Sequence, residues 1–256
     1  MAYANPAFGI LHAGAVAGFG AITPKNAMAA GQGVERLVDS RTALLAKFAA
    51  SAPDHDVEVN RGTGTLEAVD RLWIPAGHNL SGSTVTVFSG ASSPASTNRG
   101  SVVATSAAVH LAFTSNTQRF VRVAFSGTGQ WEMGELWITR YRQTVRGIDP
   151  GWEAPVSVPT VVMHFATHES TALLGPPRRI FHVTFHDVEE GSADATLLGD
   201  VANLGRAAAF LFWPPSSGAL PFIARLQDDG SREQDSPAPL VKLGHEYGFR
   251  LIEQTI

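Results

Sequence analysis

The sequence of 256 residues contains no cysteine and few charged residues. The absence of cysteine excludes disulfides, thiolate metal sites and cysteine nucleophiles, and it leaves the cellular compartment open. Asp, Glu, Lys and Arg make up 16% of the chain, below the ~25% typical of soluble domains. The formal net charge of −4 argues against non-specific nucleic-acid binding, which needs basic surface. We therefore expect no nucleic-acid partner.

The sequence also lacks a long uninterrupted apolar run. Residues 8–22 are apolar, but they are too few and too rich in glycine for a membrane span of ~20 residues. The first basic residue, Lys25, follows this stretch, whereas a signal peptide carries positive charge in front of it. We expect neither membrane insertion nor a signal peptide. Residues 1–50 are interpreted as an N-terminal arm with a short helix near 41–50.

Catalytic sequence motifs are missing as well. No Gly-x-Ser-x-Gly elbow, Walker A loop or His-Glu-x-x-His motif occurs in the chain. The two Gly-Thr-Gly segments are not followed by the lysine and helix that a phosphate-binding loop requires, so we interpret them as turns. These absences favour a binding or structural protein over an enzyme.

Short alternating segments separated by turn residues fill residues 51–145. The chain has 25 Gly and 15 Pro, and apolar and polar residues alternate in several places, as expected for half-buried strands. The regular succession of such strands predicts a β-sandwich over residues 51–145. The strands are expected at 55–60, 66–74, 84–88, 101–113 (as two strands), 120–125 and 131–139.

The second half of the chain predicts another β-rich domain. Residues 146–159 contain an Asp-Pro-Gly turn and further prolines and are interpreted as a linker. A domain with one helix at 192–204 follows over residues 160–256. Ser192 is the expected N-cap and Gly205 the expected C-cap of this helix. Strands are expected at 160–169, 178–188, 207–214, 220–228, 239–244 and 247–254.

The segment Gly77-His78-Asn79-Leu80 raises the question of an active site. An imidazole can act as an acid, a base or a metal ligand. His78, however, has no second histidine, carboxylate or cysteine at ligand spacing within its own segment, and it follows a Pro-Ala-Gly turn. Imidazole and amide side chains also satisfy backbone groups at tight corners. We interpret the segment as a structural corner.

Four further histidines form two pairs at a spacing of four residues: His164 with His168, and His182 with His186. On a helix such a pair can chelate zinc. These segments read as strands, where residues four apart are separated by about 13 Å at ~3.3 Å per residue. Neither pair can chelate a metal alone. A metal site formed by one histidine from each of two adjacent strands is the remaining alternative. We expect no metal and no cofactor.

Two other sets of residues have a functional and a structural interpretation. An acidic run could supply paired carboxylates for glycoside hydrolysis, but acids at the start of a helix are also favoured by its dipole. Four tryptophans could form a sugar platform, but buried aromatics are the more common case. We favour the structural interpretation of both sets, which comprise Asp187, Glu189, Glu190 and Asp194, and Trp131, Trp137, Trp152 and Trp213.

The first half resembles galactose-binding-like (discoidin-like) β-sandwiches, in the version found in structural proteins of long-tailed bacteriophages. In these, a Gly-His-Asn-Leu turn precedes a Thr/Val strand, and a strand with Gly-Glu-Leu-Trp closes the sandwich. The matching residues are Gly77, His78, Asn79 and Leu80, followed by Gly134, Glu135, Leu136 and Trp137. The sugar-binding loops of the family have no recognisable counterpart.

The second half resembles a segment of phage tail-tip proteins. A basic aromatic strand is followed there by a short helix and a strand that ends in Phe/Trp-Pro. The match is carried by Arg178, Arg179, Phe181, Phe185, Phe212, Trp213 and Pro214. Together the two resemblances imply a mainly β protein with an N-terminal galactose-binding-like sandwich and a second β-rich domain with one short helix.

The resemblance implies a virion structural protein of a tail tip or baseplate, of the distal-tail or adaptor type. Such a protein acts by assembling into a ring with copies of itself and with other tail proteins, in the host bacterial cytoplasm, and is then located in the virion. It is not an enzyme. The alternative is a carbohydrate-binding or receptor-binding module of the tail, with a host-surface glycan as partner. A glycan hydrolase or a histidine-metal esterase is a more remote alternative.

Overall fold

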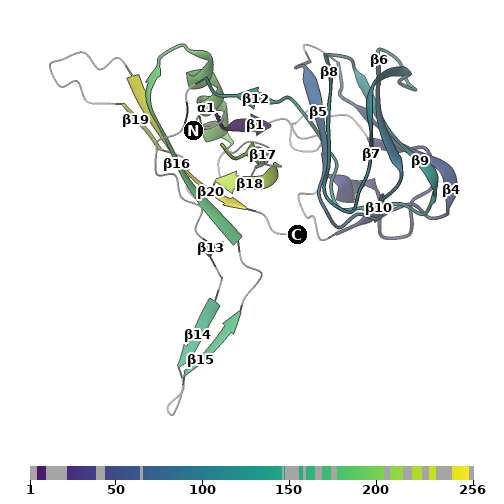
Figure 1. The fold of residues 1–256 in the computed structure, drawn as a ribbon, viewed down its shortest axis with the longest axis horizontal. Helices are drawn as coiled ribbons and strands as arrows, with labels where there is room; N and C mark the ends of the chain where they lie inside the picture. The colour runs from purple at the N-terminus through teal and green to yellow at the C-terminus, as the bar shows by residue number, and fades with distance from the viewer. Residues whose placement is uncertain are drawn as a thin grey trace. The chain divides into compact units, whose positions relative to one another are not determined.

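The structure is a computed structural model that describes residues 5–9, 22–38, 44–63, 66–145, 147, 156–157, 160–164, 169–173, 178–204, 208–215, 221–226, 231–234 and 244–253. These residues form mainly antiparallel strands with one α-helix and one 3₁₀ helix (Figure 1). The chain divides into two compact units. Unit 1 comprises residues 1–8 and 142–255, and unit 2 comprises residues 9–141.

Unit 2 consists of two main sheets. The five-stranded sheet has the order β2 (Ile22–Pro24), β4 (Ala52–Asn60), β9 (Phe120–Gly129), β6 (Thr84–Gly90), β7 (Thr97–Val103). The three-stranded sheet has the order β11 (Trp137–Thr139), β5 (Val69–Ile74), β8 (Val109–Asn116). A short pair, β3 (Ala46–Lys47) with β10 (Glu132–Met133), and the 3₁₀ helix η1 (Val34–Leu37) complete the unit.

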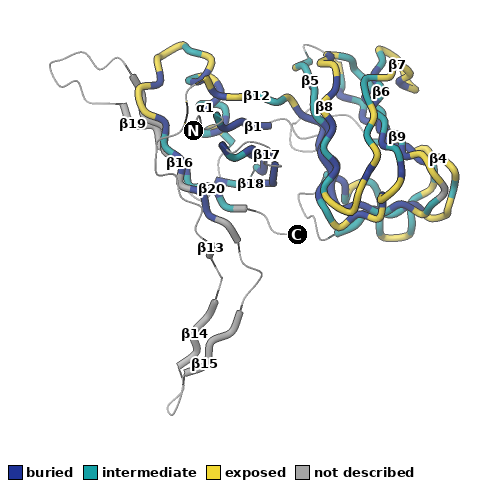
Figure 2. Tube along the Cα trace, viewed as in Figure 1, coloured by how far each residue is buried: buried dark blue, intermediate teal, exposed yellow. Residues whose placement is uncertain are grey.

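A single core lies between the two main sheets, as Figure 2 indicates by the buried positions along the strands. Val57, Val85 and Val123 contribute to it from the five-stranded sheet, and all three are at most 1% exposed. Leu72 and Leu111 contribute from the three-stranded sheet. Alternating apolar residues place one face of each strand in this core. The predicted β-sandwich is confirmed.

Unit 1 contains an eight-stranded sheet, a helix and a separate hairpin. The sheet has the order β12 (Arg142–Gln143), β1 (Ala7–Gly9), β17 (Ala209–Trp213), β18 (Phe222–Leu226), β20 (Gly244–Glu253), β16 (Arg178–Glu189), β13 (Val156–Ser157), and β19 (Ser231–Gln234) pairs with β20. The hairpin of β14 (Thr160–His164) and β15 (Glu169–Leu173) forms a two-stranded sheet of its own. The helix is α1 (Ala193–Asn203).

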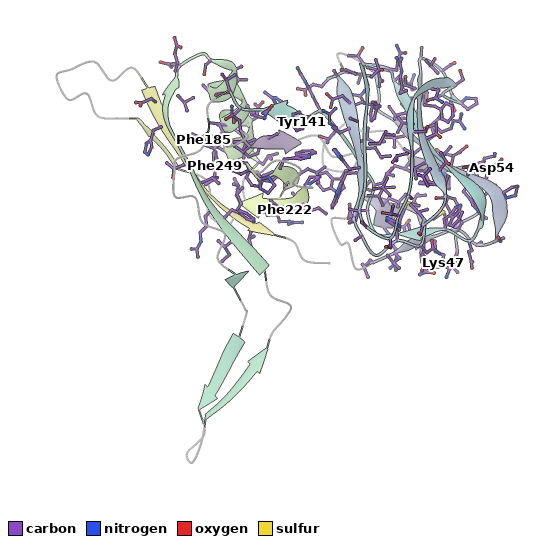
Figure 3. The ribbon with its side chains drawn as sticks, in the orientation of Figure 1. Lys47, Asp54, Tyr141, Phe185, Phe222 and Phe249 are labelled. Atoms are coloured by element: carbon purple, nitrogen blue, oxygen red, sulfur yellow. The ribbon has the colours of Figure 1, made fainter. Side chains whose placement is uncertain are left out.

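Aromatic side chains dominate the core of unit 1. Phe8 of β1 is fully buried, and its ring centroid lies 5.3 Å from that of Phe212 and 6.1 Å from that of Phe210. Phe185 and Phe249, which are labelled in Figure 3, meet edge-on at 6.5 Å. Tilted and edge-on pairs at such distances are the favourable aromatic geometries, and each ring buries a large apolar area.

The predicted helix is confirmed as α1, and it begins after the predicted N-cap residue, Ser192. The Ser192 hydroxyl accepts a hydrogen bond from the backbone N–H of Ala195 at 3.1 Å, the usual N-cap interaction. Leu197, Leu198 and Val201 of the predicted apolar stripe are buried. The predicted C-cap, Gly205, lies outside the described residues.

The N-terminal part of the chain differs from the separate arm that the sequence predicts. β1 belongs to the sheet of unit 1, whereas β2, η1 and β3 belong to the sandwich. The prediction of a helix near 41–50 is wrong for residues 46–47, because these residues form a strand that pairs with β10. The apolar residues Ala46, in β3, and Phe48, which forms an isolated β-bridge with Met28, belong instead to the sandwich core, and Phe48 is 1% exposed.

The boundary between the units also differs from the predicted linker at 146–159. The division falls between residues 141 and 142, and β12 already pairs with β1. Within the predicted linker, Val156 and Ser157 form β13, which pairs with β16. Proline and glycine occur both in turns within a domain and in linkers between domains, so their presence in the sequence does not locate the boundary.

Candidate functional site

The Gly-His-Asn-Leu segment forms the corner between β5 and β6. Gly77 has a φ of 94°, a conformation that side-chain-bearing residues rarely adopt. The Asn79 amide bridges to the β10 region: its Nδ2 donates to the carbonyl of Gln130 at 3.0 Å, and its Oδ1 accepts from the N–H of Glu132 at 2.8 Å. The Asn79 N–H also donates to the carbonyl of Glu132 at 3.2 Å. The corner thus ties two distant segments together.

His78 is buried at this corner, and both ring nitrogens contact backbone groups. Nδ1 accepts from the N–H of Leu80 at 3.2 Å, and Nε2 lies 2.9 Å from the carbonyl oxygen of Ala107. These partners require the neutral tautomer with the proton on Nε2, so that Nε2–H donates to the carbonyl. Burial lowers the pKa of His78, and the hydrogen bonds to backbone groups oppose this in part. Both ring nitrogens of the imidazole are therefore used to stabilise the fold.

The second segment of the resemblance, Gly134 to Trp137, is buried in unit 2. Glu135, Leu136 and Trp137 are all 0% exposed. The N–H of Leu136 donates to the carbonyl of Leu37 at 2.9 Å, which links η1 to this segment. Leu136 belongs to the sandwich core. The segment fixes structure rather than offering groups to a ligand.

The predicted residues of unit 1 lie in the eight-stranded sheet. Phe181 and Phe185 are buried in β16, and Trp213 is 7% exposed at the end of β17. Arg179 is paired in register with Val156 of β13. Both phenylalanine side chains pack in the aromatic core, as the alternation in the sequence predicts. The structure therefore brings the corner residues together in unit 2 and the aromatic residues together in unit 1.

The histidine pairs lie on strands where the structure describes them. His164 is in β14, and His182 and His186 are in β16, whereas His168 lies outside the described residues. A spacing of four along a strand separates two side chains too widely for joint chelation. No group of three or more His, Asp or Glu side chains in the described part of the chain has an arrangement that fits a metal ion.

The acidic run surrounds the turn between β16 and α1. Asp187, Glu189 and Glu190 are exposed there, and Asp187 has a φ of 53° at a bulge of β16. Asp194 is instead 5% exposed and accepts a hydrogen bond from the N–H of Val145 at 2.9 Å. This carboxylate holds two segments of unit 1 together.

Three of the four tryptophans considered as a sugar platform are buried. Trp131 is 9%, Trp137 0% and Trp213 7% exposed, and Trp152 lies outside the described residues. A platform requires an accessible ring face, so these three rings do not form one. Their size suits them to the cores instead.

A pocket of about 490 Å³ opens on the outer face of the five-stranded sheet. Its volume falls in the range of small-molecule sites, roughly 300–1,000 Å³. β4 and β9 form its floor, because the side chains that alternate with the core valines point outward there. The lining residues are Thr23, Pro24 and Lys25 from the β2 edge, Asp56, Glu58 and Asn60 from β4, Ser93 and Pro94 from the loop after β6, and Phe120 and Arg122 from β9.

Two buried carboxylates lie in this pocket. Asp56 and Glu58 are 8% and 9% exposed, although both belong to the outer face of β4. Glu58 accepts from the hydroxyl of Ser93 and, at 2.6 Å, from the N–H of Ala95. These bonds hold the loop after β6 against the sheet. Carboxylates are rarely buried unless they are paired or hydrogen-bonded.

Arg122 is fixed by contacts on three sides. Its Nη1 lies 3.0 Å from Asp56 Oδ2, and its Nε donates to the carbonyl of Ala95 at 2.8 Å. Its guanidinium also lies over the ring of Phe88, 4.3 Å from the centroid. A guanidinium held by an ion pair, a carbonyl and an aromatic face is pre-organised for further hydrogen bonds.

Several polar atoms of the pocket keep hydrogen-bonding capacity for a ligand. Among the described residues, no hydrogen bond involves Asp56 Oδ1, Arg122 Nη2 or Asn60 Nδ2. The first is an acceptor and the other two are donors. Phe120 adds a half-buried aromatic ring, over which the Arg119 guanidinium lies 4.9 Å from the centroid. The pocket thus combines donors, an acceptor and an apolar surface.

The sequence does not single out this pocket, although it contains part of the signal. The alternation in residues 55–60 places Asp56 and Glu58 on the face opposite Val57 and Val59. The pairing of Glu58 with Arg122 across β4 and β9 joins residues 64 positions apart. No local pattern indicates that register, so the sequence alone does not distinguish these carboxylates from ordinary solvent-facing residues.

No family model and no curated protein matches this chain. Solved structures align with about half of it. A chitosan-binding module of a chitosanase/glucanase from Paenibacillus sp. IK-5 is 17% identical over 50% of this chain and 98% of the module, with a TM-score of 0.43.

Two further structures are similar to a comparable extent. The CBM32 domains of Clostridium perfringens ZmpB, in complex with GalNAc, are 18% identical over 48% of this chain and 33% of that chain, with a TM-score of 0.40. A GH29 fucosidase from Ruminococcus gnavus, in complex with fucose, is 10% identical over 53% of this chain and 27% of that chain, with a TM-score of 0.44. At this low identity, the chain is similar over about half its length to carbohydrate-binding modules and to a fucosidase.

Proposed function

We propose that this chain is a carbohydrate-binding protein that holds its ligand in the pocket on the outer face of the five-stranded sheet. The supporting observation is the pre-organised pair of Asp56 and Arg122 on the pocket floor. Neighbouring sugar hydroxyls each donate and accept, so they match an acceptor beside a donor. The apolar face of a sugar ring can pack on Phe120. Both carboxylate oxygens of Glu58 accept hydrogen bonds from the loop after β6, which leaves Asp56 as the carboxylate that faces a ligand, and we propose binding without bond cleavage.

Filling the pocket tests this proposal. Thr23 lines the pocket and is exposed, so Thr23→Trp adds bulk there without disturbing the core. Thr97→Trp is the matched control, because Thr97 is an exposed strand residue outside the pocket lining. On a glycan array we expect a saturable signal that Thr23→Trp abolishes and Thr97→Trp retains. Equal binding by the two variants, or the absence of any glycan ligand, would contradict the proposal.

A second candidate is the virion structural role that the sequence resemblance implies, with assembly into a ring and with other tail proteins. The observation that favours it is the β14–β15 hairpin. These strands form a two-stranded sheet of their own, and an isolated hairpin is marginally stable in water. Burial against a neighbouring chain would stabilise it. Light scattering should then give a multimer for the full chain and a smaller species when residues 160–173 are replaced by a short Gly-Ser loop; a monomer in both cases would exclude self-assembly through the hairpin.

A further inference from the structure

We infer that the pocket selects electrically neutral glycans over acidic and amino sugars, an inference that rests on the proposed carbohydrate function. The first observation is the charge of the lining. Two cations, Lys25 and Arg122, and two carboxylates, Asp56 and Glu58, line the pocket. Their formal charges cancel, so no net charge attracts an ion from solution.

The arrangement of these charges opposes ions of either sign. A carboxylate of a uronic acid that approaches Arg122 also meets Asp56, whose Oδ2 lies 3.0 Å from Arg122 Nη1. An ammonium group that approaches Asp56 meets Arg122 in the same way. Both side chains are largely shielded from water, since that of Arg122 is 21% and that of Asp56 12% exposed, and charge interactions are screened less in such positions.

The unused hydrogen-bonding atoms of the pocket match hydroxyl groups. Asp56 Oδ1 can accept from one hydroxyl while Arg122 Nη2 donates to the neighbouring one, so that a vicinal diol satisfies both atoms. Asn60 Nδ2 adds a further donor. A hydroxyl pair makes these bonds without bringing a charge that the pocket must desolvate. The selected ligand class is therefore a neutral polyhydroxylated ring.

Lys25 is the residue through which this balance can be altered with the least structural change. It lies at the rim, and its ion pair with Asp54 is exposed at both ends, with 49% and 64% exposed side chains. Such exposed pairs contribute little to stability. Lys25→Gln leaves the pocket with an excess of one negative charge and keeps the floor intact. Asp56→Asn has the opposite effect on charge, but it also breaks the buried pair with Arg122.

The experiment is a glycan array in which each neutral glycan is printed beside its uronic acid and its 2-amino counterpart. We expect the wild-type chain to bind the neutral member at least tenfold more tightly than either counterpart. Lys25→Gln should reduce the discrimination against the 2-amino member several-fold, while discrimination against the uronic acid stays the same or grows. Lys47→Gln is the control, because Lys47 pairs with Glu132 outside the pocket lining.

The outcomes separate the two proposals. Preferred binding of an acidic or amino glycan that Thr23→Trp abolishes would overturn the neutral selectivity and leave the carbohydrate function in place. Binding of no glycan at all would overturn both. An identical discrimination profile for Lys25→Gln and Lys47→Gln would show that the lining charges do not set the selectivity, and would likewise overturn the inference.

Discussion

The corner at Gly77–Leu80 and the pocket on β4 and β9 use similar polar side chains in opposite ways. At the corner, both ring nitrogens of His78 and both amide atoms of Asn79 are bonded to backbone groups. In the pocket, Asp56 and Arg122 bond to each other and retain an acceptor and a donor on the open side. The burial of a polar side chain therefore does not by itself distinguish a structural site from a binding site. The distinction requires knowing which of its hydrogen-bonding atoms already have a partner in the protein.

Removing the His78 imidazole tests the structural side of this comparison most strongly. His78→Ala leaves the buried Leu80 N–H without its acceptor and the carbonyl of Ala107, an exposed residue, without its donor. An unsatisfied buried group costs about 1–3 kcal/mol and a lost hydrogen bond elsewhere about 0.5–1.5 kcal/mol, so we expect a decrease of roughly 2–4 kcal/mol in the free energy of unfolding. Chemical denaturation measures this. Glycan binding by the fraction that remains folded should be unchanged, and a loss of binding at unchanged stability would reverse the assignment of the corner.

Asn79→Leu should reduce the free energy of unfolding by less, because Asn79 is exposed. It removes the two side-chain bonds to Gln130 and Glu132, and at ~0.5–1.5 kcal/mol for each bond we expect a loss of about 1–2 kcal/mol. Asn79→Asp keeps the acceptor for the Glu132 N–H and loses the donor, so it should fall between the wild type and Asn79→Leu. An unchanged melting temperature for Asn79→Leu would contradict the structural role.

Phe120→Ala tests the binding side. The ring is half-buried on the outer face of β9, so its loss should reduce stability by only about 1 kcal/mol, including the contact with Arg119. Glycan affinity should fall at least tenfold, because the apolar surface of the pocket is lost. Phe120→Tyr retains the ring and should retain affinity. Titration calorimetry on the three proteins would exclude a role for the ring if the alanine variant bound normally.

The smallest expected effect is a dependence of stability on pH that originates at histidines outside the pocket. Burial lowers the pKa of both His78 and His110, for His110 with the help of Arg71. The unfolded chain then binds protons more readily below about 6.5, the ordinary histidine value. Their stabilising contribution is therefore complete above that pH and is lost as the pH falls through the lowered pKa of the folded state. Melting temperatures between pH 7.5 and 5.5 should decrease, and less so in His78→Ala; equal slopes would contradict the assignment to His78.

The sequence predicts the sandwich well because its strands are half-buried. In residues 84–88 and 120–125 the alternation of apolar and polar residues corresponds directly to the buried and outer faces of β6 and β9. The corner is also predictable, since a glycine at positive φ, Gly77, and an amide side chain two residues later, Asn79, are typical of turns. The pocket is not, because its floor depends on the register between β4 and β9.

Residues 1–50 are harder to interpret from sequence, because their pairing also depends on distant segments. β1 has three residues, and its place between β12 and β17 depends on partners far along the chain. Nothing in a short apolar segment specifies which sheet it joins, and strand pairing at long range is set by the whole fold. A helical spacing of apolar residues near 41–50 misleads for the same reason, since residues 46–47 pair with β10.

The position of β1 has a consequence for biosynthesis. The ribosome makes Phe8 first, but its aromatic partners Phe210 and Phe212 emerge about 200 residues later, on the order of 10–40 s at usual translation rates. The sandwich, encoded in between, can fold during this interval, whereas unit 1 must wait for the end of translation. In a chain that is truncated before Trp213, β1 lacks its complete partner strand, β17. The unpaired apolar strand at the N-terminus then favours aggregation or degradation of the truncated chain.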